Sequence, residues 1–224
     1  MSDNVIAIDG PAAAGKSTVA AKVAEKLNAF YVNTGNMYRA VTLYAIKNGF
    51  KDGISLYEFI VPLLPNLQLE YRFSEAGTPE LIMNGVPVDS SIRSHEVSKL
   101  VSALSAVPEV REWLIKRQRC LAKQKMIVME GRDIGTVVFP SAKFKFFLTA
   151  SPEVRAKRRL EQNGEIPDGA TISEVAREIA LRDEMDMKRS VAPLKKADDA
   201  ILIDCSNMNA NDVTDFIVNY VNSK

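Results

Sequence analysis

Residues 10–17 read Gly-Pro-Ala-Ala-Ala-Gly-Lys-Ser, and they directly follow the apolar run Val-Ile-Ala-Ile at positions 5–8. This is the complete pattern G-x-x-x-x-G-K-[ST], in which glycine lets the backbone wrap tightly so that successive N–H groups point at phosphate oxygens. A segment of helical period follows, with Val19, Val23 and Leu27 four residues apart, and the positive end of its dipole adds to the attraction for anions. Strand, glycine-rich loop and helix in this order predict a loop that binds the phosphates of a nucleoside triphosphate.

The side chains of this loop have different expected contacts. Lys16 is expected to reach the β- and γ-phosphates, and the Ser17 hydroxyl to ligate Mg²⁺. The loop residues expected to bind the nucleotide are Gly10, Pro11, Ala12, Ala13, Ala14, Gly15, Lys16, Ser17 and Thr18. A strand-to-helix turn that binds nothing is the alternative interpretation of the loop taken alone.

Composition narrows the class of protein. A chain of 224 residues with 46% apolar side chains can bury a full core as one domain with a small insertion. The 29 basic and 28 acidic side chains give a net charge of +1, which argues against a broad nucleic-acid surface.

Cysteine usage and hydropathy narrow it further. Cys120 and Cys205 are far apart, and with His95 as the single histidine they predict no zinc site. No apolar run approaches the roughly 18 residues of a membrane span, and Met-Ser-Asp-Asn is not a signal peptide. We therefore expect a cytoplasmic protein without a membrane partner.

Apolar runs typical of buried strands recur along the chain at 5–9, 29–33, 126–130, 143–149 and 200–204. Their nearly continuous hydrophobicity favours strands that are covered on both faces, as in parallel sheets.

Helix signals lie between these strands. Ser151-Pro152-Glu153 predicts a helix that opens at 152, and the capping box Thr171-x-x-Glu174 predicts one running to about 190. A terminal helix is expected to bury one apolar stripe, made of Val213, Phe216, Ile217, Tyr220 and Val221. Alternation of strands and helices predicts an α/β fold, a doubly wound sheet of about five parallel strands of the P-loop NTPase type.

One stretch departs from this alternation. Residues 67–73, 81–83 and 86–89 alternate apolar and polar side chains, and Asn84-Gly85 is a strong hairpin signal between two of them. Residues 62–92 are therefore predicted to form a small antiparallel β insertion, with the α/β core at 1–61 and 93–224.

Arginines gather where a phosphate site is expected. Arg39 follows the second predicted strand and Arg132 the third, and ligands of open α/β sheets bind beyond the carboxyl ends of the strands. Phosphoryl transfer relies on alignment and cationic stabilisation, for which the guanidinium fork is suited. The arginines also have simpler interpretations than a role in a phosphate site. Arg155, Arg158 and Arg159 could form a solvated helix face.

Two further pairs also have simpler alternatives. Arg182 and Asp186 could be a surface ion pair one helical turn apart. Asp133 could only orient Arg132 through a salt bridge. A signalling GTPase is excluded by motif, because no glycine has an aspartate three residues before it and no asparagine precedes a lysine.

Several strings together resemble the bacterial cytidylate (CMP) kinase family. They are Ile8-Asp9-Gly10-Pro11, Thr34-Gly35-x-Met37-Tyr38-Arg39-Ala40, Glu130-Gly131-Arg132-Asp133-Ile134-Gly135-Thr136-Val137-Val138-Phe139-Pro140, Arg155-Ala156-x-Arg158-Arg159 and Arg182-Asp183-x-x-Asp186-x-x-Arg189-x-x-Ala192-Pro193-Leu194. They follow the family order over almost the whole chain, and the insertion at 62–92 also fits the family.

The resemblance implies a monomeric enzyme that transfers the γ-phosphoryl group of ATP to CMP and dCMP with Mg²⁺. It implies catalytic roles for Lys16, Arg132, Arg182 and Arg189, and ATP contacts for Arg155 and Arg159 in addition to the loop. The implied substrate-binding residues are Thr34, Tyr38, Arg39, Ser102, Arg111, Arg132, Asp133, Arg182, Asp186 and Arg189. Among them, Ser102, Arg111 and Asp133 match positions that read the cytosine edge, and Asp186 matches a pentose contact.

Two further points come from the resemblance. Residues 155–170 correspond to a mobile lid over ATP, whose closure excludes water. Asn33 stands where many family members have an acid, which leaves open how the hydrogen bonds near the acceptor phosphate are arranged. Another small-molecule P-loop kinase, such as an adenylate or shikimate kinase, and a nucleotide-dependent regulator remain the alternatives.

Overall fold

The computed structural model describes residues 2–73, 78–123, 125–161 and 169–224 of the chain. Its centre is a five-stranded sheet in the order β2-β6-β1-β7-β8, and all four pairings in this sheet are parallel. The strands are β1 (Ser2–Asp9), β2 (Phe30–Asn33), β6 (Ile127–Gly131), β7 (Ala142–Thr149) and β8 (Ile201–Asp204). Each predicted core strand is present, which confirms the parallel α/β sheet.

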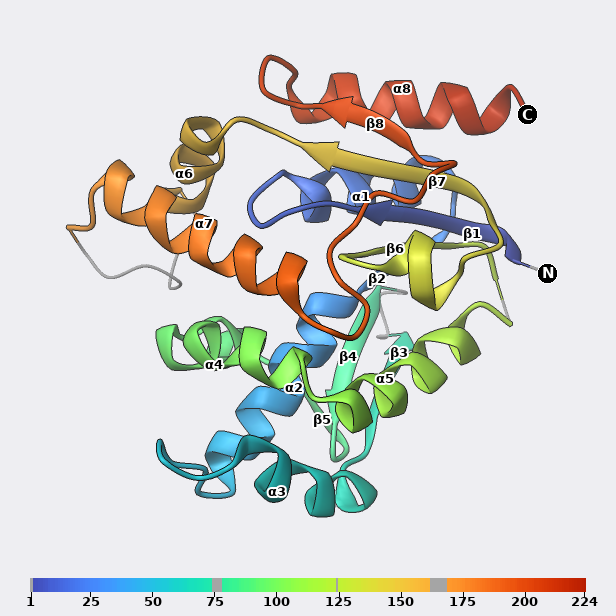
Figure 1. Cartoon of the computed structure of the whole chain (residues 1–224). Helices are drawn as coiled ribbons and strands as arrows, with labels where there is room; N and C mark the ends of the chain where they lie inside the picture. The colour runs from blue at the N-terminus through green and yellow to red at the C-terminus, as the bar shows by residue number, and fades with distance from the viewer. Residues whose placement is uncertain (1, 74–77, 124, 162–168) are drawn as a thin grey trace.

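Helices cover both faces of this sheet (Figure 1). The α-helices of the described residues are α1 (Lys16–Lys26), α2 (Thr34–Lys47), α3 (Leu56–Ile60), α4 (His95–Ser105), α5 (Pro108–Leu121), α6 (Pro152–Leu160), α7 (Ile172–Lys188) and α8 (Ala210–Asn222), of which α3 and α4 lie in the lower half of Figure 1, away from this sheet. Alternate residues of β1 show how the two faces are filled. Ile6 and Ile8 belong to the apolar cluster under α1 and α8, whereas Val5 and Ala7 belong to the cluster on the opposite face. Burial on both faces explains the nearly continuous hydrophobicity of this strand.

The predicted helix caps are confirmed. The Ser151 hydroxyl accepts a hydrogen bond from the Val154 N–H (3.3 Å), so α6 begins at Pro152. Thr171 and Glu174 form the capping box of α7, which ends at Lys188, close to the expected 190. The apolar stripe of α8 is narrower than predicted, because Phe216 is 44% exposed while Val213 and Ile217 are buried.

The insertion forms a second, antiparallel sheet in the order β3-β4-β5, with β3 (Leu69–Phe73), β4 (Pro79–Met83) and β5 (Val86–Pro87). Asn84 and Gly85 make the two-residue turn with φ of 50° and 81°, as their sequence predicts. The predicted turn at 74–79 lies largely outside the described residues. Leu69 and Leu81 belong to an apolar cluster with residues of α2, α4 and α5. These elements form the lower half of the molecule in Figure 1.

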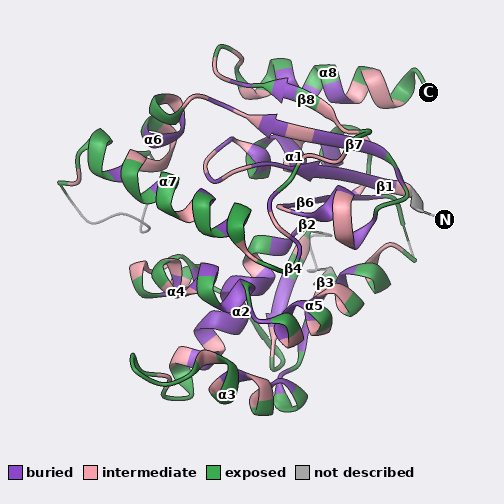
Figure 2. Ribbon diagram, in the orientation of Figure 1, coloured by how far each residue is buried: buried purple, intermediate pink, exposed green. Residues whose placement is uncertain are grey.

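Figure 2 shows buried residues running along the central strands and through α2. None of the helices in the described ranges is long and apolar enough to span a bilayer. Of the predicted lid at 155–170, the structure describes the end of α6 and residues 169–170, and residues 162–168 lie outside it.

Candidate active site

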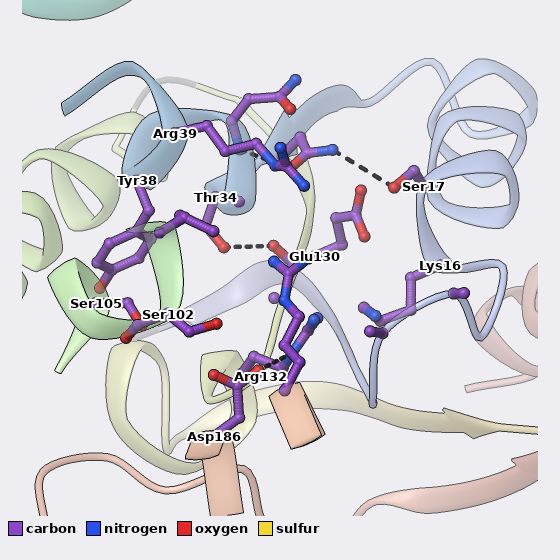
Figure 3. Close-up of a pocket in the computed structure, with 18 of the residues that line it drawn as sticks. Lys16, Ser17, Thr34, Tyr38, Arg39, Ser102, Ser105, Glu130, Arg132 and Asp186 are labelled. Carbon is purple, nitrogen blue, oxygen red and sulfur yellow. Dashed lines mark hydrogen bonds and ion pairs between the residues drawn. The ribbon is translucent and has the colours of Figure 1, made fainter. Parts of the chain in front are cut away.

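A cleft of about 440 Å³ opens at the carboxyl ends of β1, β2 and β6. It lies between the glycine-rich loop on one side and residues of α2, α4 and α5 on the other. Figure 3 shows Lys16 and Ser17 on one side of it, Tyr38 and Ser102 on the other, and Arg132 between them. Of the predicted residues, those that line the cleft are Ala12, Ala13, Ala14, Gly15, Lys16, Ser17, Thr18, Thr34, Tyr38, Arg39, Ser102, Arg111, Arg132, Asp133, Arg159, Arg182, Asp186 and Arg189. Gly10, Pro11 and Arg155 do not line it. The fold thus gathers at one edge of the sheet nearly all of the residues that the sequence singled out.

The glycine-rich loop is shaped by two backbone conformations that favour glycine. Gly10 has φ of 149°, and a Cβ on it would lie 2.1 Å from the Leu148 carbonyl oxygen, so no side chain fits where the loop crosses β7. Gly15 has φ of 92° and is the N-cap of α1. The Lys16 ammonium turns back onto this loop and donates to the Pro11 carbonyl oxygen (2.6 Å).

Lys16 is buried, and burial disfavours the charged form of its side chain. Burial, reinforced by the positive charge of Arg132, lowers the pKa of Lys16 to about 7, although Glu130 opposes the shift. An anion bound in the loop would reverse this effect by stabilising the ammonium form.

Asn33 connects the loop to β2 and β6. Its side-chain oxygen caps α2 by accepting from the Asn36 N–H (3.0 Å), and its amide nitrogen lies 3.2 Å from the Tyr31 hydroxyl and 3.5 Å from that of Ser17. Tyr31 in turn donates to the Glu130 carboxylate (2.7 Å). Asn33 therefore caps α2 with a neutral side chain. The carboxylate at this point of the cleft is that of Glu130.

Glu130, to which the sequence assigns no role, also lines the cleft. The signal in the sequence is an acid that ends an otherwise apolar strand. Together with the Ser17 hydroxyl it gives this part of the cleft oxygen ligands, which suit Mg²⁺. Among the described residues, no group of three or more His, Cys, Asp or Glu side chains forms a metal site by itself.

Arginine side chains around the Asp186 carboxylate form the middle of the cleft. Arg132 donates from Nε to the Asp186 carboxylate (2.8 Å), and the Arg182 Nε is buried with no hydrogen-bond partner in the described part of the chain. Burial, with Arg132, Arg39 and Arg159 nearby, lowers the pKa of Arg182 to about 9. Asp186 is buried, which opposes its charge, but Arg132 and Arg182 hold its pKa below the ordinary value. The guanidinium that bonds Asp186 is thus that of Arg132, and Arg182 and Asp186 are not a surface pair.

A second charged group closes the far end of the cleft. Arg111 forms a buried ion pair with Asp133, and the Arg189 guanidinium lies 3.6 Å from Asp133 and 3.8 Å from Asp186. The Ser105 hydroxyl, which sequence reasoning missed, lies 3.5 Å from the Arg189 guanidinium. Asp133 therefore pairs with Arg111 and Arg189, not with Arg132 as one interpretation of the sequence suggested.

Arg155 lies behind the loop and not in the cleft. It forms a buried ion pair with Asp183 and donates to the Ala12 carbonyl oxygen (3.2 Å), while Asp183 accepts from the Ala12 N–H (3.0 Å). The pair thus holds both polar groups of the Ala12 backbone. In this arrangement its guanidinium faces the loop backbone, and the direct contact of Arg155 with ATP stays a prediction.

A neighbouring cleft of about 330 Å³ lies on the other side of the loop, between α1, α6 and the start of α8. Arg158 crosses its wall and donates to the Cys205 carbonyl oxygen (2.8 Å). Ala13, Ala14, Gly15 and Thr18 line both clefts, so the glycine-rich loop separates two adjoining cavities.

Comparisons with known proteins agree with this geometry. The family model described as cytidylate kinase matches residues 6–223. The chain is 46% identical to a cytidylate kinase of Geobacillus sp. (strain WCH70), covering 100% of this chain and 99% of that one. It is 45% identical to a cytidylate kinase of Clostridium botulinum (strain Okra / Type B1), covering 99% of each. A crystal structure of an uncharacterized protein from Eubacterium ventriosum ATCC 27560 has a TM-score of 0.55 at 15% identity, covering 98% of this chain and 99% of that one, and shows the fold alone. Because these matches extend over nearly the whole sequence, the chain belongs to the cytidylate kinase family.

Proposed function

We propose that this enzyme transfers the γ-phosphoryl group of ATP to CMP and dCMP, giving ADP and CDP or dCDP. The observation that carries the proposal is one continuous cleft that joins a phosphate-binding loop to the buried Arg111–Asp133 pair. The two relatives named cytidylate kinase support it through 45–46% identity over essentially full length.

The donor nucleotide has a natural orientation in this cleft. ATP phosphates bind the loop N–H groups, Lys16 and Ser17, and the adenosine extends into the neighbouring cleft lined by Arg158, Cys205 and Met208. Mg²⁺ would be held by the Ser17 hydroxyl together with the ATP phosphates, and it neutralises charge on the β- and γ-oxygens. Arg155 acts on the donor indirectly, because it fixes the Ala12 backbone.

The acceptor phosphate faces the loop from the other side. Arg39, Arg132 and Arg182 supply positive charge there, and Thr34 adds a hydroxyl that donates to the Glu130 carbonyl oxygen (2.7 Å). Because the transition state spreads negative charge over several oxygens, alignment by these guanidinium groups supplies most of the catalysis. Arg189 extends the same positive charge toward the nucleoside.

The acceptor base lies at the far end, beside Tyr38. The Asp133 carboxylate accepts a hydrogen bond from the cytosine N4 amino group, and Ser102 and Arg111 donate to N3 and O2. Asp186 contacts the pentose. UMP presents a carbonyl where CMP presents the amino group, so its oxygen would face the carboxylate and be repelled. Discrimination therefore follows from the charge of a buried side chain.

Residues 155–170 are proposed to close over ATP as a lid that excludes water. We also propose that the protein acts as a monomer in the cytoplasm on small-molecule substrates, with neither nucleic acid nor membrane as a partner. The net charge of +1 is in keeping with this.

The proposal is tested by ADP release with ATP, Mg²⁺ and each nucleoside monophosphate or shikimate in turn. We expect the highest kcat/KM with CMP and dCMP, and nearly complete loss of turnover in Lys16→Ala, because the phosphates lose their main side-chain cation. Equal or faster release with AMP or shikimate would contradict the assignment. ADP release that needs no acceptor would favour a nucleotide-dependent regulator instead.

A further inference from the structure

Asp9 is buried at the end of β1, immediately before the glycine-rich loop, and it does not line the cleft. β1 lies between β6 and β7, and Asp9 pairs in register with Gly131 at the end of β6. The chain that leaves β6 carries Arg132 and Asp133 and then turns through Ile134–Val138. The end of β1 and the turn after β6 are therefore neighbours, although they are more than a hundred residues apart in the sequence.

Both oxygens of the Asp9 carboxylate bind this turn. Oδ1 accepts from the Ile134 N–H (2.8 Å), and Oδ2 accepts from the Gly135 N–H (2.7 Å). Asp133, the residue before the turn, makes no side-chain cap to it, since its carboxylate pairs with Arg111. Asp9 thus supplies from another strand the cap that Asp133 does not supply locally.

The fit between Asp9 and the turn is tight. A Cβ on Gly135 would lie 3.3 Å from the Asp9 Oδ2 and 3.2 Å from the Lys145 side chain. On the cleft side, a Cβ on Gly131 would lie 2.7 Å from the Thr34 hydroxyl. The backbone on either side of Arg132 and Asp133 is therefore packed so closely that a side chain at Gly131 or Gly135 would contact its neighbours.

We propose that Asp9 is a positioning residue for the acceptor site. Its two hydrogen bonds fix the backbone from which Arg132 and Asp133 reach the acceptor nucleotide, and they tie that backbone to the start of the donor loop. The inference rests on the proposed function for its readout, since it concerns how CMP is aligned. Asp9 itself contacts neither nucleotide. Its effect passes through the turn, where a displacement of about 1 Å can cost on the order of 10²-fold in rate.

The first test is Asp9→Asn, which keeps the size of the side chain but turns an amide N–H toward one of the two backbone N–H groups. We expect kcat/KM for CMP to fall by at least roughly 10-fold and KM for ATP to change by less than about threefold. We also expect the ratio of kcat/KM for CMP to that for UMP to decrease, because Asp133 is displaced. A thermal melt of each variant reports whether the fold is intact.

The second test approaches the same contact from the turn. Gly135→Ala inserts a methyl group beside the Asp9 Oδ2 and is expected to reproduce the selective loss for CMP. The double variant is expected to lose less than the product of the two single effects, because both changes break one contact. The matched control is Asp215→Asn, since Asp215 of α8 is 55% exposed and forms a surface ion pair with Lys26 at the end of α1. It is expected to keep wild-type kinetics.

A merely structural Asp9 would lower the melting temperature while KM for ATP and for CMP move together and the CMP/UMP ratio stays unchanged. That result, or wild-type kinetics in both single variants, would overturn the inference. Failure of the proposed function is distinguishable, because it appears in the wild-type enzyme as preference for another acceptor. In that event the KM of that acceptor, compared with the KM of ATP, decides the role of Asp9.

Discussion

Arg132 and Asp186 are separated by 54 residues in the sequence and meet in the cleft, where the guanidinium Nε lies 2.8 Å from the carboxylate Oδ2. The pair joins the end of β6 to α7 and keeps a cation close enough to Lys16 to lower its pKa. Arg132 is thus held by a carboxylate on one element while its charge acts on the phosphate loop of another.

Arg132→Ala and Arg189→Ala are each expected to lower kcat/KM for CMP by at least roughly 10²-fold, because guanidinium groups that act on a transferring phosphoryl group are worth about 10³- to 10⁵-fold. Steady-state kinetics with CMP as the varied substrate measures the loss. Arg72→Ala is the matched control, since Arg72 is 60% exposed and pairs with Glu70 in the insertion. Near wild-type kinetics in both cleft variants would show that these arginines are structural.

Asp133→Asn is expected to reduce kcat/KM for CMP more than for UMP, so that the ratio of the two narrows. The physical reason is that a charged hydrogen bond to the cytosine amino group is worth about 1.5–3 kcal/mol, roughly 10- to 150-fold. The amide keeps the shape of the side chain and an oxygen for Arg111. Competition assays with both monophosphates give the ratio directly. If CMP and UMP lose the same factor, the base is read by other residues.

Binding of ATP near pH 8 is expected to take up close to one proton at Lys16. Without nucleotide, the Lys16 side chain has a pKa of about 7 and is therefore mostly a neutral amine at pH 8. Bound phosphates favour the charged ammonium form and raise this pKa again. ATP affinity should therefore decrease as the pH rises above 7. Calorimetry in buffers of different ionisation enthalpy counts the proton.

The control for proton uptake is Lys16→Arg, because arginine stays charged throughout this pH range. Its complex with ATP is expected to form with much smaller uptake and with a flatter dependence of affinity on pH. Equal uptake in the two proteins would assign the proton to another group.

Asp183→Ala is expected to lower the free energy of unfolding by about 3–5 kcal/mol, because it leaves the Arg155 guanidinium buried without its partner. It should also weaken ATP more than CMP, since Asp183 holds the Ala12 N–H of the loop. The adjacent Glu184→Ala is the control, because Glu184 is 52% exposed and pairs only on the surface with Lys188, which contributes less than about 1 kcal/mol. Urea unfolding and nucleotide titration measure the two effects, and equal destabilisation by both variants would refute the assignment to Asp183.

The sequence predicts those parts of the fold whose causes are local. The caps at Ser151 and Thr171 and the Asn84-Gly85 turn each depend on residues within a few positions of one another, and all three are confirmed. The same holds for the core strands, because burial on both faces leaves its mark in continuous hydrophobicity.

The parts that escaped prediction depend on distant partners. Helical position alone does not tell that Arg155 turns away from the cleft, because its partner Asp183 lies on another helix. Asp9 carries no local sign that its oxygens cap a turn 125 residues away. Phe216 has the right spacing for the stripe of α8 but is 44% exposed, because spacing alone does not tell how wide a strip of the helix is covered.

The Tyr71 hydroxyl of the insertion binds the backbone of Asn33 in β2. It accepts from the Asn33 N–H (3.3 Å) and donates to the Asn33 carbonyl oxygen (3.0 Å), which are groups that a neighbouring strand would otherwise pair. β2 is an edge of the five-stranded sheet, and free edges invite other chains to add strands. The Tyr71 side chain of the insertion thus occupies, at Asn33, backbone groups that an added strand would need.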